Sequence, residues 1–313
     1  MKKHILFAAA ALVLAACSND DENINSPVEA RISAGVDDPT TRAINDRWEA
    51  DAIGVRVTAS SSGMEKLYKN VKYTTAAQGS GAATFTPASQ GIFFRDDAET
   101  VTFAAYGPYH ESAANALPGT SGVITGSTAV QSTRKEQKAF DYIFASGATA
   151  SRSNANVRFT GSNAFAHKMT RLVVIVKASD SDGFAGDEAK TGTYTLGGLN
   201  HNGQFNVTEG KAEATGTEKS ADWSLSANSL KEEINNTVAF TSILYPQTLS
   251  AALAFKAEIG GRTYTNSTIR PALESGKSYT YTVTVKKTGL VISGCTIEDW
   301  NDGGSYTGDA TMQ

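Results

Sequence analysis

The side chains that could act as acids, bases, nucleophiles or metal ligands are few and widely spaced in this sequence. Three histidines follow the apolar amino-terminal segment, His110, His167 and His201, and none stands two or four residues from another, the spacing typical of a metal site. No Gly-x-Ser-x-Gly sequence is present to position a serine nucleophile. The sequence therefore predicts no catalytic residue, no metal site and no cofactor. We expect His167 to be a packed, hydrogen-bonded side chain.

Carboxylates occur in pairs and in one acidic run. Asp37-Asp38 and Asp96-Asp97 lie in predicted turns, and spacing alone does not decide whether two carboxyl groups face each other across a cleft, as glycosidase chemistry requires. The run from Asp180 to Glu188 has the composition of a calcium loop but lacks the twelve-residue pattern that ends in a bidentate glutamate. We interpret it as an acidic hairpin tip and leave cation binding there open.

Cys17 points to a different chemistry, covalent lipidation. Lys2 and Lys3 precede an apolar run, residues 5–16, that is too short for a membrane-spanning helix and is typical of a secretory signal. Leu14-Ala15-Ala16-Cys17 matches a bacterial lipobox. In a lipobox the thiol takes a diacylglycerol and the preceding peptide bond is cut, so residues 1–16 would be the signal peptide. The alternative is an ordinary signal peptide cut near Ala16, with Cys17 incidental.

The residues around the two cysteines refine this interpretation. The acidic run at residues 18–22 resembles the tract that sends some Gram-negative lipoproteins to the outer face of the outer membrane, and its alternative is a solvated tether. Lipidation of Cys17 would leave Cys295 without an intrachain partner, so we expect no disulfide. Cys295 has no base or cation nearby in the sequence to activate its thiol, and we expect a small buried strand residue.

Composition excludes one class of partner and favours one fold class. The net charge is -4 and no basic cluster stands out, so nucleic-acid binding is not expected. Glycine is abundant, charged residues make up only 19%, and no second apolar run reaches spanning length. The chain is long enough for two domains, with a single large β-sandwich as the alternative. We predict an exported all-β protein.

Hydrophobic alternation predicts the strands that would position any site. Val28, Ala30 and Ile32 would share one face of a first strand, and the cleanest period-two pattern runs from Lys277 to Lys286. Further strands are expected at residues 51–57, 100–106, 140–145, 157–159, 171–177, 238–244, 253–264 (as a hairpin through Gly260-Gly261) and 292–300. Residues 108–138 are expected to form a surface excursion.

An exposed arginine follows the first predicted strand. The loop from Val36 to Ala43 is polar, contains Pro39 as a breaker, and carries Arg42 beside small residues. Loops of this kind are readily cut by proteases. A trypsin-like protease would therefore cut readily between Arg42 and Ala43, and the family resemblance described next implies an arginine-specific one.

Several of these motifs, in their order along the chain, resemble the fimbrillin family of type V pilins. They are the lipobox, Thr40-Thr41-Arg42-Ala43 shortly before Trp48 and Asp51-Ala52-Ile53-Gly54-Val55, Phe165-Ala166-His167, Ser278-Tyr279-Thr280-Tyr281-Thr282-Val283-Thr284-Val285, and Ile297-Glu298-Asp299-Trp300. The resemblance covers most of the mature chain. It implies two β-sandwich domains of transthyretin-like topology, a precursor carried to the surface as a lipoprotein, and cleavage where Arg42 stands.

The resemblance divides the chain and gives it a mode of assembly. We expect a signal peptide at 1–16, a lipidated tether with a cleavable strand at 17–42, an N-terminal sandwich at 43–161 and a C-terminal sandwich at 162–313. Cleavage would release the strand of Val28, Ala30 and Ile32 and expose unpaired strand edges, which a strand of another fimbrial subunit could fill. Candidate donor residues are Ile292, Ile297 and Trp300.

Two alternatives stay open at this point. The Gly- and Asp-rich tail, residues 301–313, is a poor donor strand, so a tip or accessory subunit competes with a repeating shaft subunit. A hypothesis from another class is a monomeric surface lipoprotein that binds glycan or another host or bacterial surface ligand through loops such as 108–138. That hypothesis requires exposed aromatic side chains gathered in one pocket.

Overall fold

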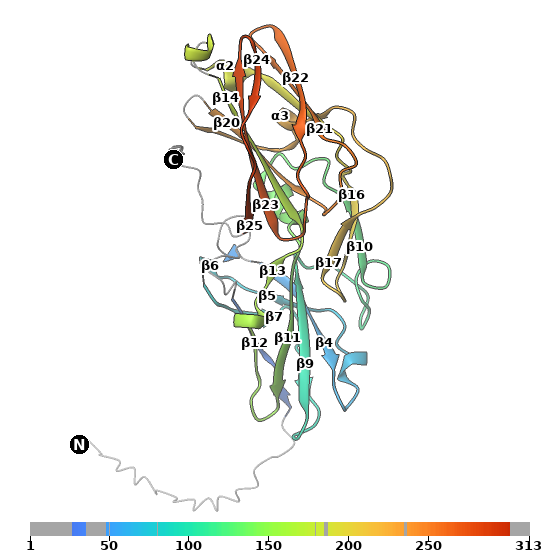
Figure 1. The fold of residues 1–313 in the computed structure, drawn as a ribbon. Coiled ribbons are helices and arrows are strands. Elements are labelled where there is room, and N and C mark those ends of the chain that lie inside the picture. Colours follow the sequence, from blue (N-terminus) through green and yellow to red (C-terminus); the bar gives the residue numbers. More distant parts are fainter. Residues whose placement is uncertain are drawn as a thin grey trace, which may run out of the picture.

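The computed structural model describes residues 27–35, 48–49, 51–79, 81–178, 180–184, 187–234 and 237–300. Almost all regular structure in these residues is β-strand, so the predicted all-β class is confirmed. None of the described helices is long and apolar enough to cross a membrane. The molecule is elongated, with the strands of the first half at one end and those of the second half at the other (Figure 1).

The first half forms one continuous eight-stranded sheet, in the order β12-β2-β7-β5-β4-β9-β11-β13, and two small two-stranded sheets, β1-β8 and β3-β6. The elements are β1 Val28–Glu29, β2 Arg31–Ala34, β3 Trp48–Glu49, β4 Ala52–Ala59, η1 Met64–Lys66, β5 Val71–Thr74, β6 Gln78–Gly79, β7 Ala83–Pro87, β8 Phe93–Phe94, β9 Thr100–Gly107, β10 Val123–Ser127, α1 Arg134–Phe140, β11 Ile143–Ser151, β12 Asn156–Phe159, η2 Gly161–Asn163 and β13 Ala166–His167.

A single apolar cluster fills this half. Strands along most of the sheet order contribute to it, for example Phe159 on β12, Val55 on β4 and Ala145 on β11, all of them buried. Trp48 also enters the cluster and meets the Phe85 ring edge-on, with ring centroids 5.0 Å apart. The strands of this sheet other than β13 therefore share a common core.

The second half contains a six-stranded and a four-stranded sheet. The elements are β14 Thr170–Lys177, η3 Asp180–Asp182, α2 Glu188–Thr191, β15 Thr193–Gly197, β16 Asn202–Asn206, β17 Lys211–Ala214, β18 Trp223–Ser224, α3 Leu225–Asn228, β19 Leu230–Ile234, β20 Thr237–Leu244, β21 Leu253–Ile259, β22 Arg262–Ile269, β23 Lys277–Lys286, β24 Gly289–Ile292 and β25 Thr296–Asp299.

These two sheets pack face to face as a sandwich. The larger has the order β19-β20-β14-β23-β24, with β25 also paired to β23, and the smaller has the order β18-β15-β21-β22. Val174 of the larger sheet and Phe255 of the smaller belong to the same buried cluster. β14 is central in the larger sheet, and, as the period-two pattern predicted, alternate residues of β23 from Tyr279 to Val285 face the core.

The predicted hairpin at Gly260-Gly261 is confirmed. Ile259 pairs with Arg262 across a two-residue connection, and both glycines have positive φ, 56° and 71°. Residues with a Cβ rarely adopt this conformation at two consecutive positions, which is why the turn requires glycine.

A third sheet joins the two halves. It has the order β10-β16-β17, so a strand of the first half pairs with a hairpin of the second (Figure 1). A separate cluster lies beside it and contains Tyr106 and Tyr142 from the first half with Phe205 and Tyr245 from the second. The division at residues 161/162 and the transthyretin-like topology stay predictions.

Candidate assembly site

β2 lies inside the first sheet, between two strands that come later in the chain. It runs parallel to β12 and antiparallel to β7, where Ile32 stands opposite Phe85. The ladder extends beyond the strand, because the amide of Arg31 donates to the carbonyl of Ala155 at 2.8 Å. β2 is therefore paired on both sides.

The inward face of this segment carries small and medium apolar side chains. Ala30, Ile32 and Ala34 are 3%, 1% and 0% exposed, and Val28 is half-buried against the same cluster. Val28, Ala30 and Ile32 stand on the face that the sequence predicted. Ala34 was missed there, although the same period-two pattern includes it.

The segment is not one continuous strand. β1 pairs with β8, with Val28 opposite Phe94, whereas β2 pairs with β7 and β12. Ala30 lies between them, and its amide donates to the carbonyl of Ile92 at 2.8 Å. The segment therefore changes partners at Ala30.

The carboxyl-terminal region contains two short strands in place of the single predicted strand from 292 to 300. Ile292 of β24 pairs with Val283 and Ile297 of β25 pairs with Tyr279, so the two strands cover different parts of β23. Ile292 is half-buried against the core, whereas Ile297 is 58% exposed. The two candidate donor residues are thus in different environments.

Trp300, the third candidate donor residue, is buried where the two halves meet. It is 1% exposed, and its indole stacks on the ring of His167 with centroids 4.3 Å apart and planes at 7°. Its amide donates to the carbonyl of Gly276 at 2.7 Å. On the other side, His167 Nδ1 lies 2.6 Å from Oδ1 of Asp141. His167 is thus packed and hydrogen-bonded, as the sequence predicted.

No sequence signal connected Asp141, His167 and Trp300. They are 26 and 133 residues apart, and only the tertiary structure brings them together. Three other predicted sites, Cys17, Arg42 and Ala43, lie outside the described residues, as do the tether and the tail beyond Trp300.

His110 and His201, the other histidines in the described residues, belong to no group of potential metal ligands. Burial lowers the pKa of His201 to about 4, and its ring packs against Trp223 with centroids 4.5 Å apart. Burial also lowers the pKa of His110. Among the described residues no group of three histidine, cysteine or carboxylate side chains could hold a metal ion.

The acidic run at 180–188 is only partly described, because residues 185 and 186 are outside the described ranges. Its Asp182 side chain lies 3.6 Å from the ammonium of Lys286. Phe184 is buried in the second core, 2% exposed. The described part of the run is therefore held by the ion pair of Asp182 with Lys286 on β23 and by the burial of Phe184 in the second core.

Cys295 lies between β24 and β25, half-buried, rather than within a strand as predicted. Burial raises the pKa of its thiol. A thiol with a raised pKa is a weak nucleophile at neutral pH.

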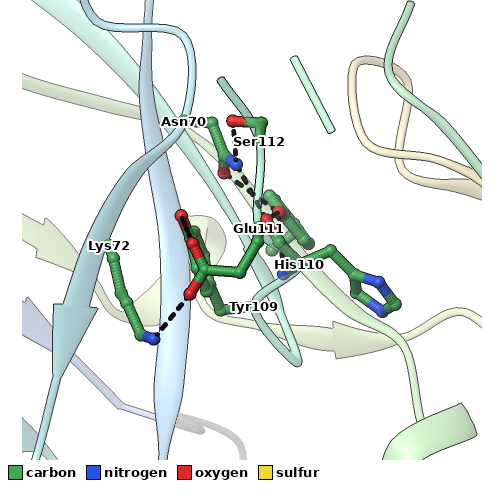
Figure 2. Close-up of polar contacts among 7 residues, drawn as sticks. Asn70, Lys72, Tyr109, His110, Glu111 and Ser112 are labelled. Atoms are coloured by element: carbon green, nitrogen blue, oxygen red, sulfur yellow. Dashed lines mark hydrogen bonds and ion pairs between the residues drawn. The ribbon is translucent and has the colours of Figure 1, made fainter. Parts of the chain in front are cut away.

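The excursion at 108–138 is attached at its beginning by polar contacts (Figure 2). The Asn70 side-chain amide donates to the carbonyl of His110 and to the hydroxyl of Ser112, both at 2.9 Å. Lys72 lies 3.0 Å from the carboxylate of Glu111. The His110 ring points away from these contacts (Figure 2).

The end of the excursion is also ordered. β10 pairs with β16, and α1 begins with a capping box in which Thr133 and Glu136 bond each other's backbone amides. The Gln131 side chain, 0% exposed, bonds both backbone groups of Ile243 on β20, at 2.6 Å to the amide and 2.9 Å to the carbonyl. Because these contacts bury the Gln131 side chain, this end of the predicted surface excursion is docked on β20.

Comparison with known proteins decides the family. A family model described as fimbrillin-like matches residues 41–300. The chain belongs to this fimbrillin-like family. The family is one of structural fimbrial proteins and not of enzymes, and its members assemble with other fimbrial subunits on the cell surface.

Relatives with known names agree with the family assignment. The chain is 28% identical over 325 residues to "Putative fimbrium subunit Fim1C" of Bacteroides uniformis, covering 99% of this chain and 100% of that protein. It is 27% identical to a crystal structure of "a putative cell adhesion protein" of Bacteroides ovatus, with a TM-score of 0.72 over 89% of this chain and 100% of the other. A second such structure, from Bacteroides uniformis, has 24% identity and a TM-score of 0.65 over 88% and 99% of the two chains.

Proposed function

We propose that this fimbrillin-like protein is exported as an outer-membrane lipoprotein on Cys17 and becomes a fimbrial subunit by protease-triggered strand exchange. The trigger is a cut between Arg42 and Ala43 by an arginine-specific protease. The cut separates residues 17–42 from two β-sandwich domains, which we place at 43–161 and 162–313.

The observation that carries the proposal is the position of β2. It precedes Arg42 in the chain yet lies inside the first sheet, between β12 and β7, with Ile32 1% exposed. Once the chain is cut, this strand is held by noncovalent contacts alone. Its departure would leave β7 and β12 each with an unpaired edge, and a free edge beside an apolar groove is a template for another strand.

The donor strand is proposed to come from the other end of a neighbouring subunit. Trp300 is anchored between the halves, and β25, which directly precedes it, is also paired with β23. We therefore place the donor in the residues beyond Trp300, or in β25 with the exposed Ile297 once Trp300 has left its buried position. Ile292 packs on the core, so we expect β24 to stay in its own subunit when the donor strand leaves. A contact from one end of a subunit to the opposite end of the next does not close, and therefore propagates as a filament.

The test is limited proteolysis of the purified precursor with an arginine-specific protease, followed by intact mass and size-exclusion chromatography. We expect one cut after Arg42, loss of the 17–42 segment, and polymers whose amount increases with concentration. Arg42→Gln is the matched control and stays whole and monomeric. Cleavage without polymers would assign a tip or accessory role, and resistance of the native Arg42 would contradict the proposal.

The second candidate function is a monomeric surface lipoprotein that binds glycan or another surface ligand through residues 108–138. It needs an exposed aromatic cluster. In the part of the chain that the structure describes, the exposed large apolar side chains are Val130, Val291 and Ile297, all aliphatic. A glycan-array screen of the R42Q precursor tests this function separately, because that variant cannot be processed at this site.

A further inference from the structure

The amino-terminal segment places an acidic side chain in an unsuitable position. Oε1 of Glu29 on β1 is buried and has no hydrogen-bond partner, while its neighbours Val28 and Ala30 pack on the first core. A buried acceptor without a partner is unfavourable, most of all when it belongs to a carboxyl group. Glu29 therefore weakens the hold of the segment on the groove that it fills.

Gly91 makes room for this carboxyl group. A Cβ at Gly91 would lie 1.8 Å from Oε1 of Glu29, closer than any real contact. The φ of Gly91 is not positive, so an added Cβ would meet no backbone strain, only the end of the Glu29 side chain, which would have to move. The missing side chain leaves a notch beside β1, which we call the Gly91 notch.

The wall around the Gly91 notch is held by residues that stay after cleavage. The amide of Ile92 donates to the hydroxyl of Tyr73 at 3.1 Å, and the amide of Phe93 donates to the hydroxyl of Tyr68 at 3.3 Å. Both tyrosines follow Arg42 in the chain. These two hydrogen bonds therefore remain when the segment leaves, although β8 then loses its strand partner β1.

We infer that the Gly91 notch is a specificity site for strand exchange. The notch contacts the side chain that takes the position of Glu29 in whichever strand fills the groove. It favours a small or apolar side chain at that position over an acidic one. Its ligand is an extended strand of another fimbrial subunit with an uncharged residue at that register. Discrimination against the resident Glu29 makes the exchange favourable. The inference rests on the proposed function.

Hydrogen–deuterium exchange of the amides in residues 28–34 of the intact precursor tests the notch without cleavage. Glu29→Met keeps a side chain of similar length without the carboxyl group, and we expect exchange about tenfold slower, because an unpaired buried acceptor is removed. Gly91→Ala fills the notch and moves the same carboxyl group towards solvent, which also removes the unpaired buried acceptor, so we expect exchange slower than in the wild type. Arg31→Ala, an exposed position on the same segment, is the control and leaves the rate unchanged.

A double-mutant cycle separates the notch from a general loss of stability. Glu29→Ala combined with Gly91→Ala frees the space that the added methyl group needs, so we expect exchange within about twofold of Glu29→Ala alone. Additive effects of the two substitutions, or faster exchange in Glu29→Met, would overturn the inference. Amides of β14 and β23 serve as an internal reference for variants that unfold as a whole.

The preference for the incoming strand is measured on the cleaved protein. Synthetic peptides of residues 27–35 with Glu, Ala or Met at position 29 compete for the groove, read by mass spectrometry of the complex. We expect the Ala and Met peptides to displace the resident segment and the Glu peptide to be at least about tenfold weaker. Equal binding of all three would overturn the inference, whereas failure of cleavage at Arg42 would contradict only the proposed function and leave the exchange cycle as the decisive test.

Discussion

At the scale of single residues, Glu99 shows how this surface-exported fold stabilises a loop without a disulfide. The side chain is 5% exposed and accepts hydrogen bonds from the amide of Ser62 at 2.8 Å and from the hydroxyls of Ser62 and Ser61 at 2.7 and 3.2 Å. Burial alone would raise the pKa of Glu99, but these serine groups, with Ser60, outweigh it and lower the pKa to about 2. The charged form is therefore favoured in the folded state.

The first prediction is an acid-dependent loss of stability through Glu99. Its folded pKa of about 2 lies below its ordinary value of 4.5, so the stabilisation is complete above pH 4.5 and is lost as the pH falls towards 2. Glu99→Gln should lower the free energy of unfolding by about 2 kcal/mol at pH 7. The difference from the wild type should vanish near pH 2 in urea titrations, whereas the exposed Glu111→Gln should show no such dependence. A constant difference at all pH values would contradict the assignment.

The second prediction concerns Trp300 as an anchor. Trp300→Ala removes a buried indole from the His167 ring and should cost about 3–5 kcal/mol of unfolding free energy. Trp300→Phe keeps a ring that can stack and should cost less than half as much. Urea denaturation followed by far-UV circular dichroism measures both values. A cost below about 1 kcal/mol for the alanine variant would show that Trp300 is replaceable by solvent.

At the scale of secondary-structure elements, burial and not composition distinguishes the strands at the two ends of the chain. β2 and β25 have the same length, and each contains one isoleucine. Ile32 is 1% exposed between two partner strands, whereas Ile297 is 58% exposed on an edge. An edge strand with an exposed apolar side chain is free to take another partner, and a buried central strand is not until the chain is cut.

The third prediction uses this pair of isoleucines. Ile32→Ala should lower the free energy of unfolding by about 2–4 kcal/mol, because it leaves a cavity in the first core. Ile297→Ala, the matched control, should change it by less than about 0.5 kcal/mol. Chemical denaturation of the intact precursor measures both free energies of unfolding. Similar losses in the two variants would show that β2 is not a core strand.

At the scale of the whole molecule, the sheet β10-β16-β17 and the docked excursion join the two halves into one body. Arg56 of β4 donates to the carbonyl of Thr208 at 3.0 Å, and the indole of Trp223 donates to the carbonyl of Ala129 at 2.7 Å. Together with the bonds between Gln131 and Ile243, these contacts include donors from the first half and donors from the second half.

The fourth prediction is that the halves unfold together and that Gln131 couples them. The wild type should give one calorimetric transition. Gln131→Ala leaves the amide and carbonyl of Ile243 unpaired in the interior, should cost about 2 kcal/mol or more, and should split the transition into two. Lys135→Ala, exposed on α1, is the control. Two transitions in the wild type would show that the halves are thermodynamically independent.

The all-β class, the positions of the longest strands along the chain and the hairpin at Gly260-Gly261 could be predicted from the sequence. These features depend on residues that are close together in the sequence, through the period-two burial of strands and the positive φ of glycine in turns. The inward face of Val28, Ala30 and Ile32 follows from the same rule. Local rules failed where tertiary contacts decided the outcome, as at the docked end of residues 108–138 and in the division of residues 292–300 into two strands.

The sequence by itself determined which strands form and which of their faces are apolar, because apolar and polar residues alternate along each strand. Only the tertiary structure decided which strands become neighbours. It placed β2 between β7 and β12, set Trp300 against His167, and brought Gly91 under the carboxyl group of Glu29. The physical reason is that strand pairing is set by long-range contacts between residues far apart in the chain, and their energy does not depend on their spacing in the sequence.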